Sequence, residues 1–287
     1  MIPGSFDYHC PTTVDEAVAL LGEYGEEARA IAGGHSLIPM MKLRLAAPEH
    51  LIDLRRIDSM RGISRDAGSI VIGATTTQAE IIVSPVIAAD LPILSETATL
   101  IADPQVRAVG TIGGNVANGD PGNDMPALMQ CLGADYVLKG PGGERTVAAR
   151  DFYEGTYFTA LEEGELLTAI RIPQPPAGIG WAYEKLKRKV GDYATAAAAV
   201  LLKMDGDTCS FASVALTNVG DTPLFAAEAA EALVGSKLDA AAINAAVAAA
   251  EAITNPASDG RGPAEYRTKM AGVMVRRAIA RARNRAA

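Results

Sequence analysis

The segment ADPQVRAVGTIGGNVANGDPGNDMPALMQCL, residues 102–132, decides the fold of this chain. Its adjacent glycines, Gly113 and Gly114, stand among polar residues and prolines, a composition that is untypical of a core element. Adjacent glycines permit positive φ angles and allow the backbone to approach a ligand closely. Successive N–H groups exposed at such a turn form a concave anion-binding site. A polar loop with a bulge is the alternative, and for an isolated Gly-Gly pair it would be preferred.

Short polar side chains around these glycines indicate the chemistry of a ligand. Threonine and asparagine supply hydrogen-bond donors, and carboxylates supply acceptors for hydroxyl groups. The pattern therefore favours a ligand that has both phosphate and hydroxyl groups, although Asp120 could simply stabilise the following Pro-Gly turn. These side chains belong to Thr111, Asn115, Asn118, Asp120 and Asp124.

A second glycine turn, AGGHS at residues 32–36, follows a predicted strand over residues 28–31 and precedes a predicted helix over residues 37–44. A strand, a glycine turn and a helix N-terminus in succession commonly bind phosphate. The turn matches neither the P-loop motif nor the G-x-G-x-x-G fingerprint. Two such turns fit the two phosphates of a pyrophosphate, one on each side. The sequence therefore predicts a dinucleotide ligand such as FAD.

Longer motifs around both turns resemble the flavoprotein subunits of the molybdenum hydroxylases, the xanthine dehydrogenase family. They are AGGHSLIPMMKLR at residues 32–44 and TIGGNVANGDPGNDMPAL at residues 111–128. The chain is similar from end to end to the carbon monoxide dehydrogenase branch of this family. That similarity includes MIPGSFDYH (1–9), YEKLKRKVGDYATAAAAV (183–200) and SDGRGPAEYRTKMAGVMVRRA (258–278). It covers essentially all 287 residues.

The resemblance implies an α+β fold. A two-part FAD-binding module of the vanillyl-alcohol oxidase type would precede a C-terminal α+β domain with a three-stranded antiparallel sheet and helices. The sequence itself places a boundary at Pro173–Pro176, because this proline-rich segment excludes both helix and strand ladder. We expect FAD-binding subdomains over residues 1–56 and 57–176 and a flavoprotein domain over residues 177–287.

Local patterns make three further predictions. A helix over residues 76–83 should be capped by Thr75 or Thr76. The alanine-rich segment 194–204 favours a helix by propensity, but the Asp-Gly turn after it indicates a hairpin, so we predict a buried strand. A last helix over residues 264–283 ends in a cluster of arginines that should form a solvated face. They are Arg276, Arg277, Arg281, Arg283 and Arg285.

By resemblance, both glycine motifs bind FAD. Backbone N–H groups of residues 32–37 and 111–115 would hold the pyrophosphate. Asp124 resembles the family aspartate that contacts ribityl or ribose hydroxyls, and capping of a helix over residues 126–131 is the competing interpretation. The complete set from the two motifs is Ala32, Gly33, Gly34, His35, Ser36, Leu37, Thr111, Ile112, Gly113, Gly114, Asn115, Asn118 and Asp124.

Further residues are implied to contact the isoalloxazine ring. Lys185 or Lys187, alternate residues of one predicted strand, would place positive charge near the pyrimidine end of the flavin. An exposed edge or a subunit contact is the alternative for each lysine. Tyr193 would stack on the ring or belong to the core, and Leu161 would supply a backbone contact. No residue is predicted to be catalytic, because the flavin performs the redox chemistry.

Composition and charge restrict the class of the protein. A net charge of −8 argues against nucleic acid or an anionic membrane surface as the main partner. Neither a signal peptide nor an apolar stretch of about 18 residues is evident. The three cysteines and three histidines lack metal-ligand spacing. We therefore predict no metal on this chain and free thiols in a reducing cytoplasm.

The predicted function is electron transfer. FAD on this chain would take electrons from two [2Fe–2S] clusters on a small subunit and pass them to a quinone or cytochrome of the respiratory chain. The resemblance implies oxidation of carbon monoxide on a large subunit, at a molybdenum–copper centre with molybdopterin cytosine dinucleotide. Dimers of such heterotrimers would lie in the cytoplasm at the inner face of the membrane.

Two other functions compete with this prediction. The chain could serve a molybdenum hydroxylase that acts on xanthine, nicotine or an aldehyde, since substrate choice lies on another chain. A stand-alone flavin oxidoreductase is the second alternative, but it would need a base or a substrate anchor, and the sequence offers no candidate. A cofactor-free scaffold would leave both glycine turns unexplained.

Overall fold

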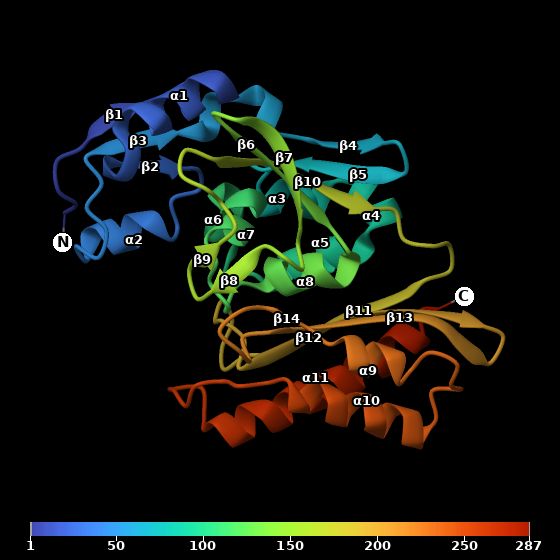
Figure 1. Cartoon of the computed structure of the whole chain (residues 1–287). Coiled ribbons are helices and arrows are strands. Elements are labelled where there is room, and N and C mark those ends of the chain that lie inside the picture. The colour runs from blue at the N-terminus through green and yellow to red at the C-terminus, as the bar shows by residue number, and fades with distance from the viewer. Residues whose placement is uncertain (1, 287) are drawn as a thin grey trace.

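The computed structural model describes residues 2–286, which form three main sheets in chain order with their helices (Figure 1). The first sheet is parallel, in the order β1-β3-β2. Parallel neighbours require crossover connections, which the two helices supply. The strand predicted over residues 28–31 and the helix after the first glycine turn are confirmed. The elements are β1 (Asp7–His9), α1 (Val14–Tyr24), β2 (Ala28–Ile31), α2 (Leu37–Lys42) and β3 (His50–Asp53).

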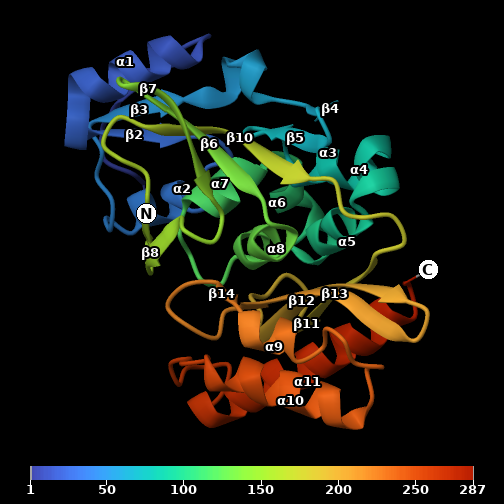
Figure 2. The same ribbon diagram turned by 45° about the vertical axis from the view of Figure 1, so that its right-hand side comes forward.

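The second sheet is antiparallel, in the order β4-β5-β10-β6-β7. Helices from the same part of the chain lie between it and the third sheet (Figure 2). The strands are β4 (Ile63–Asp66), β5 (Ser69–Gly73), β6 (Asp135–Gly140), β7 (Gly143–Ala148) and β10 (Leu166–Pro173), with a hairpin of β8 (Tyr153–Gly155) and β9 (Phe158–Thr159). The helices are α3 (Gln78–Val83), α4 (Pro85–Asp90), α5 (Pro92–Leu100), α6 (Pro104–Val109), α7 (Ile112–Ala117) and α8 (Asp124–Leu132).

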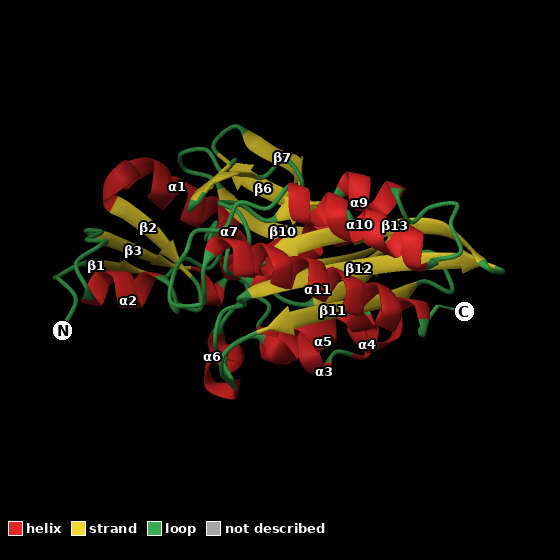
Figure 3. Ribbon diagram, turned by 90° about the horizontal axis from the view of Figure 1, so that it is seen from below, coloured by secondary structure: helices red, strands yellow, loops and turns green. Residues whose placement is uncertain are grey.

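The third sheet is antiparallel, in the order β11-β12-β13-β14, and α10 and α11 cross its outer face (Figure 3). The predicted α+β class is confirmed, and a two-residue fourth strand extends the predicted three-stranded sheet. The elements are β11 (Gly180–Leu186), β12 (Ala196–Asp205), β13 (Thr208–Thr217), β14 (Leu224–Phe225), α9 (Ala227–Glu231), α10 (Ala240–Ala252) and α11 (Ala264–Arg283).

Strand β12 separates two hydrophobic cores, which confirms the buried strand predicted for the alanine-rich segment. Successive side chains of a strand point to opposite faces. Ala197, Ala199 and Leu201 accordingly join the core shared with α8 and the second sheet. Ala196, Ala198 and Val200 face α11, against which α10 packs. Small alanine side chains allow helices to pack closely on both faces, so burial overrides the helix propensity of alanine.

The cap of helix α3 differs from the prediction. Thr77, not Thr75 or Thr76, accepts a hydrogen bond from the Glu80 N–H at 3.2 Å, and the Glu80 carboxylate bonds back to Thr77. Thr75 and Thr76 instead direct their hydroxyl groups to carbonyl oxygens of the preceding loop. Three consecutive threonines made the cap ambiguous from sequence. The helix therefore begins at Gln78, two residues later than predicted.

The predicted solvated arginine face is wrong in part. Arg281 donates to Glu184 at 2.9 Å and lies 2.7 Å from Glu96 of α5. Arg285 pairs with Glu96 at 3.0 Å and stacks on Trp181 at 3.7 Å from the ring centroid. These contacts connect the C-terminal end of the chain to both β11 and α5, and they hold the third sheet against α5. The spacing of arginines in the sequence does not distinguish such ion pairs from a solvated surface.

Short segments of the chain connect each sheet to the next. Strand β3 ends at Asp53 and β4 begins at Ile63, while β10 ends at Pro173 and β11 begins at Gly180. The domain boundaries at residues 56/57 and 176/177 stay predictions. Within residues 2–286, no helix combines the length and apolar character that crossing a bilayer requires.

Candidate cofactor site

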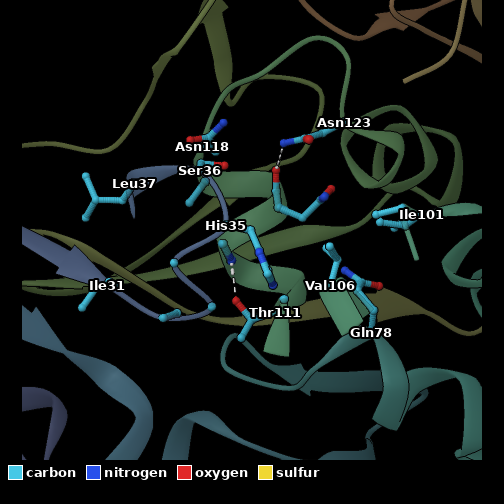
Figure 4. A pocket seen from close by; sticks show the side chains of 18 of the residues that line it. Ile31, His35, Ser36, Leu37, Gln78, Ile101, Val106, Thr111, Asn118 and Asn123 are labelled. Atoms are coloured by element: carbon cyan, nitrogen blue, oxygen red, sulfur yellow. Dashed lines mark hydrogen bonds between the residues drawn. The ribbon is translucent and has the colours of Figure 1, made fainter. Parts of the chain in front are cut away.

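A cavity of about 720 Å³ lies where the three parts of the chain meet, a size typical of small-molecule sites. Both glycine turns line it, together with residues of the loop before β10 and of the third sheet (Figure 4). Every predicted cofactor residue contributes to its wall except Ile112, Gly113 and Lys187. The predicted residues that line it are Ala32, Gly33, Gly34, His35, Ser36, Leu37, Thr111, Gly114, Asn115, Asn118, Asp124, Leu161, Lys185 and Tyr193.

The first glycine turn exposes a run of unpaired backbone donors. Within residues 2–286, no hydrogen bond engages the N–H groups of residues 33–37, and the helical ladder begins only with Ile38 donating to the Gly34 carbonyl. Gly34 adopts φ +72°, a left-handed conformation that favours glycine. Consecutive N–H groups around such a residue form a concave anion-binding site. This turn has the donors that a pyrophosphate requires.

The second glycine turn is different. Gly113 and Gly114 lie inside α7, so the expected positive φ angles are absent there. All four N–H groups that follow Thr111 have acceptors within the chain, and phosphate binding by these groups stays a prediction. Ile112 donates to the Thr76 carbonyl (2.9 Å), Gly113 to the Ala74 carbonyl (2.8 Å), Gly114 to Thr111 Oγ1 (3.1 Å) and Asn115 to the Thr111 carbonyl (3.1 Å).

Close packing explains two of the glycines. A Cβ on Gly33 would lie 2.7 Å from the Val109 carbonyl oxygen and 2.8 Å from Gly110 Cα. A Cβ on Gly113 would lie 2.5 Å from that of Ala74. Gly33 therefore lets the first turn touch the segment just before the second, and Gly113 lets α7 touch the end of β5. Both contacts position the walls of the cavity.

Helix α7, which contains the second glycine turn, and the start of α8 form a second wall of the cavity. Side chains supply the polar groups of this second wall. The Thr111 hydroxyl caps α7 and faces the cavity, and Asn118 ends the same helix. Asn123 donates to the Asn115 carbonyl at 2.7 Å, while Asn115 Oδ1 accepts from Met125 N–H at 3.3 Å. Asn115 and Asn123 therefore hold α7 and α8 together, and all three asparagines line the cavity.

Asp124 forms a buried ion pair. Its carboxylate accepts from Lys185 Nζ at 2.6 Å and from the Tyr183 hydroxyl at 2.7 Å. The Lys185 and Asp124 side chains are 2% and 4% exposed, and Lys185 also donates to the Leu100 carbonyl at 3.3 Å. Asn123 occupies the N-cap position of α8, so the capping interpretation of Asp124 is wrong. The pair instead joins α8 to β11 at the cavity wall.

Lys187 lies away from the cavity wall but close to this pair. Burial lowers the pKa of Lys187, and repulsion from the Lys185 ammonium group lowers it further. Of the two lysines, only Lys185 lines the cavity.

Two tyrosines meet at Asp120 on the rim. The hydroxyl groups of Tyr157 and Tyr193 each lie 3.2 Å from Asp120 Oδ2. Burial and the nearby Asp120 carboxylate raise the pKa of Tyr193, so it remains a neutral phenol. Tyr193 is 41% exposed, which contradicts its assignment to the core. Asp120 also accepts from Gly122 N–H at 2.9 Å, which confirms its role in the turn.

Several wall residues carry no recognisable sequence signal. Ile101 and Val106 resemble core residues, and Tyr157 lies in a loop without a motif. Gln78, the first residue of α3, could be suspected only as a polar residue inside an apolar helix. Among residues 2–286 no group of three His, Cys, Asp or Glu side chains is arranged to bind a metal. The unpaired donors of the first turn, the polar second wall and the cavity size fit a dinucleotide such as FAD.

Family models match nearly the whole chain. The model described as the FAD binding domain in molybdopterin dehydrogenase matches residues 4–175. The model described as the CO dehydrogenase flavoprotein C-terminal domain matches residues 181–282. The two matches meet at the proline-rich segment after β10.

Curated proteins and solved structures are similar over their full length. The carbon monoxide dehydrogenase medium chain of Afipia carboxidovorans is 68% identical over 100% of this chain and 99% of its own. The 6-hydroxypseudooxynicotine dehydrogenase complex subunit alpha of Paenarthrobacter nicotinovorans is 36% identical over 100% and 97%. A structure of Cu,Mo-CO dehydrogenase matches with a TM-score of 0.99, 68% identity and complete coverage of both chains. Quinoline 2-oxidoreductase from Pseudomonas putida matches with a TM-score of 0.94, 35% identity and 99% coverage of both.

Proposed function

This chain belongs to the FAD-binding subunits of the molybdopterin dehydrogenases, and from that membership we propose that it is the FAD-carrying subunit of a carbon monoxide dehydrogenase. The observation that supports it best is the run of unpaired N–H groups at residues 33–37 on the wall of a dinucleotide-sized cavity. Bound FAD supplies the redox chemistry, and the protein positions it and tunes its electrostatics. The residues of this chain therefore bind and orient the cofactor.

Each wall has its own part in binding. The N–H groups of residues 33–37 hold the pyrophosphate, with Ala32 at the entry to the turn. Side chains of Thr111, Asn115 and Asn118 donate from the second wall, where Gly114 allows close approach. The isoalloxazine ring and the ribityl chain contact four residues on the side of the cavity at the third sheet. These are Asp124, Leu161, Lys185 and Tyr193.

Lys185 rather than Lys187 is the cation next to the flavin, because only Lys185 lines the cavity. Its pairing with Asp124 fixes the ammonium group in place, since the side chain is buried and the contact is 2.6 Å. The domain division at residues 56/57 and 176/177 follows the ends of the three sheets.

The partner chains follow from the family. A small subunit with two [2Fe–2S] clusters delivers electrons, and a large subunit with molybdenum, copper and molybdopterin cytosine dinucleotide oxidises carbon monoxide. The complex is a cytoplasmic dimer of heterotrimers that passes electrons to a quinone or cytochrome. A flavin subunit acting with a different hydroxylase is the second candidate, favoured by the 36% identity to a dehydrogenase of a nicotine derivative.

The test is to purify the complex from its host, identify the chains that purify with this one, and record the visible spectrum with and without carbon monoxide. We expect FAD and iron–sulfur absorption, two partner chains, and bleaching by carbon monoxide. The same spectrum without bleaching would favour another substrate on the large subunit. A flavin-containing chain without partners would contradict the proposed electron-transfer role.

A further inference from the structure

Three segments that are far apart in the sequence meet at the rim of the cofactor cavity. Tyr157 lies in the turn between β8 and β9, Tyr193 lies in the segment between β11 and β12, and Asp120 lies between α7 and α8. Both tyrosines line the cavity, and they are 58% and 41% exposed. A ligand in the cavity can therefore reach both of them.

One carboxylate oxygen connects the two tyrosines. The hydroxyl groups of Tyr157 and Tyr193 both donate to Asp120 Oδ2, each at 3.2 Å. The second oxygen of this carboxylate, Oδ1, accepts from the Gly122 N–H at 2.9 Å, and this bond fixes the orientation of the Asp120 side chain. An ionised carboxylate accepts several hydrogen bonds, so it serves both phenols at once.

The turn that contains Asp120 also packs against both tyrosines. A Cβ on Gly119 would lie 3.0 Å from Tyr157 Cα, and the Tyr157 N–H donates to the Gly119 carbonyl at 2.8 Å. A Cβ on Gly122 would lie 3.1 Å from Tyr193 Cδ1. Tyr157 itself adopts φ +64°, which is unusual for a bulky residue and requires support from its surroundings. The turn over residues 119–122 therefore sets the position of both aromatic residues.

Two aromatic side chains at one end of a cavity suit a flat ring of a ligand. Aromatic rings stack or pack edge to face, and tyrosine combines an apolar ring with a polar hydroxyl group. In the proposed function, the isoalloxazine ring lies on the side of the cavity at the third sheet, where Tyr193 is also located. The two tyrosines at the rim are therefore placed to contact this ring, while the N–H groups of residues 33–37 hold the pyrophosphate.

We propose that Asp120 is a positioning residue of the flavin site, which holds Tyr157 and Tyr193 in the arrangement in which both contact the isoalloxazine ring. Side chains that are ordered before binding lose less conformational entropy when the ligand binds. Asp120 itself does not line the cavity, so it raises FAD affinity through the tyrosines. The inference rests on the proposed FAD function and extends it to Asp120 and Tyr157.

The test compares Tyr157→Phe and Tyr193→Phe with Tyr153→Phe in the purified complex after removal and re-addition of FAD. Phenylalanine keeps the ring and removes the hydroxyl group. Tyr153 belongs to the same hairpin as Tyr157, but its hydroxyl group lies 3.0 Å from that of Tyr136, and it is outside the cavity wall. We expect each of the first two variants to weaken FAD binding by about 2- to 10-fold, the cost of ordering one side chain on binding, and Tyr153→Phe to leave it unchanged.

Asp120→Ser tests whether Asp120 acts through both tyrosines. A serine hydroxyl also accepts from the N–H two residues on, so the turn is kept, but serine lacks the carboxylate oxygen that the phenols share. In the Asp120→Ser background, neither Tyr157→Phe nor Tyr193→Phe should weaken FAD binding further. The circular dichroism of bound FAD, taken as the difference between the FAD-loaded and FAD-free complex, reports on the surroundings of the flavin ring. It should change in Asp120→Ser and in both of these phenylalanine variants, but not in Tyr153→Phe.

Wild-type FAD affinity and circular dichroism in Tyr157→Phe and Tyr193→Phe would overturn the inference. Equal losses of affinity in the wild-type and Asp120→Ser backgrounds would also overturn it, because the tyrosines would then act independently of Asp120. If Asp120→Ser does not assemble, the phenylalanine variants decide alone, since Asp120 is the partner of both hydroxyl groups. A wild-type complex that holds no FAD would instead overturn the proposed function, so the two failures are distinguishable.

Discussion

Residues 33–37 and 111–115 both place a Gly-Gly pair at the start of a short helix on the wall of one cavity, yet their N–H groups have different partners. Those of the first turn have none within residues 2–286. Those of the second turn bond to the Ala74 and Thr76 carbonyls and to Thr111. The same dipeptide therefore leaves free backbone donors in one turn and serves internal packing in the other.

The difference follows from the neighbours of each turn. The first turn connects a parallel strand to a short helix and faces the cavity with its backbone. The second turn lies between the end of β5 and α8, where Gly113 packs against Ala74. The second wall therefore offers the cavity side chains rather than backbone N–H groups, and substitutions in the two walls should have separable effects on cofactor binding and on stability.

The largest effect on stability is expected for Asp124→Asn on the second wall. Asparagine leaves the buried Lys185 ammonium group without its counter-charge, and removing one partner of a buried ion pair costs about 3–5 kcal/mol. Denaturant unfolding of the FAD-free chain measures this loss. The control is Asp120→Asn on the rim, for which we expect less than about 1 kcal/mol. Similar losses in both variants would contradict the structural role of the buried pair.

Gly113→Ala should separate stability from binding. The added methyl group would lie 2.5 Å from the Ala74 Cβ, and overpacking of this kind costs about 1–3 kcal/mol. Because the Gly113 N–H already bonds to the Ala74 carbonyl, the folded variant should still bind FAD with nearly wild-type affinity. Thermal unfolding and a flavin fluorescence titration measure the two quantities. Loss of FAD binding at unchanged stability would assign phosphate binding to this turn after all.

In contrast to Gly113→Ala, Gly34→Ala should weaken FAD binding. An alanine at φ +72° costs about 1–2 kcal/mol in the FAD-free chain. FAD affinity should fall by roughly tenfold or more in addition, because re-aimed N–H groups lose hydrogen bonds to charged phosphate oxygens worth about 1.5–3 kcal/mol each. The same titration measures the affinity. Wild-type FAD affinity in this variant would contradict binding of the pyrophosphate by the first glycine turn.

Much of the architecture could be predicted from the sequence. Glycine and proline patterns act locally, so they predicted the strand over residues 28–31 and the helix that follows the first glycine turn. Segment 194–204 required a judgement between propensity and context, and the Asp-Gly turn after it decided for a strand. The structure then showed that its alternate side chains face two cores. The Thr77 cap was missed although Glu80 follows it by three residues, because Gln78 stands in the same relation to Thr75.

The site was less predictable, since its contacts join distant segments. The Asp124–Lys185 pair spans 61 residues, and nothing near Asp124 distinguishes an ion pair from a helix cap. The acceptors at Ala74 and Thr76 that occupy the second turn lie nearly forty residues before it. The contact of Tyr157 and Tyr193 with the same carboxylate of Asp120 became visible only in the structure. Sequence motifs therefore identified the segments of the site but not which atoms in them are free.

Hydrogen exchange of the backbone amides, with and without FAD, tests the central claim most directly. We expect the amides of residues 33–37 to exchange rapidly in the FAD-free chain and to become protected when FAD binds. Those of residues 112–115 should already be protected without FAD, because they are hydrogen-bonded within the chain. If FAD instead protects residues 112–115 and leaves residues 33–37 unchanged, the assignment of the pyrophosphate to the first turn is contradicted.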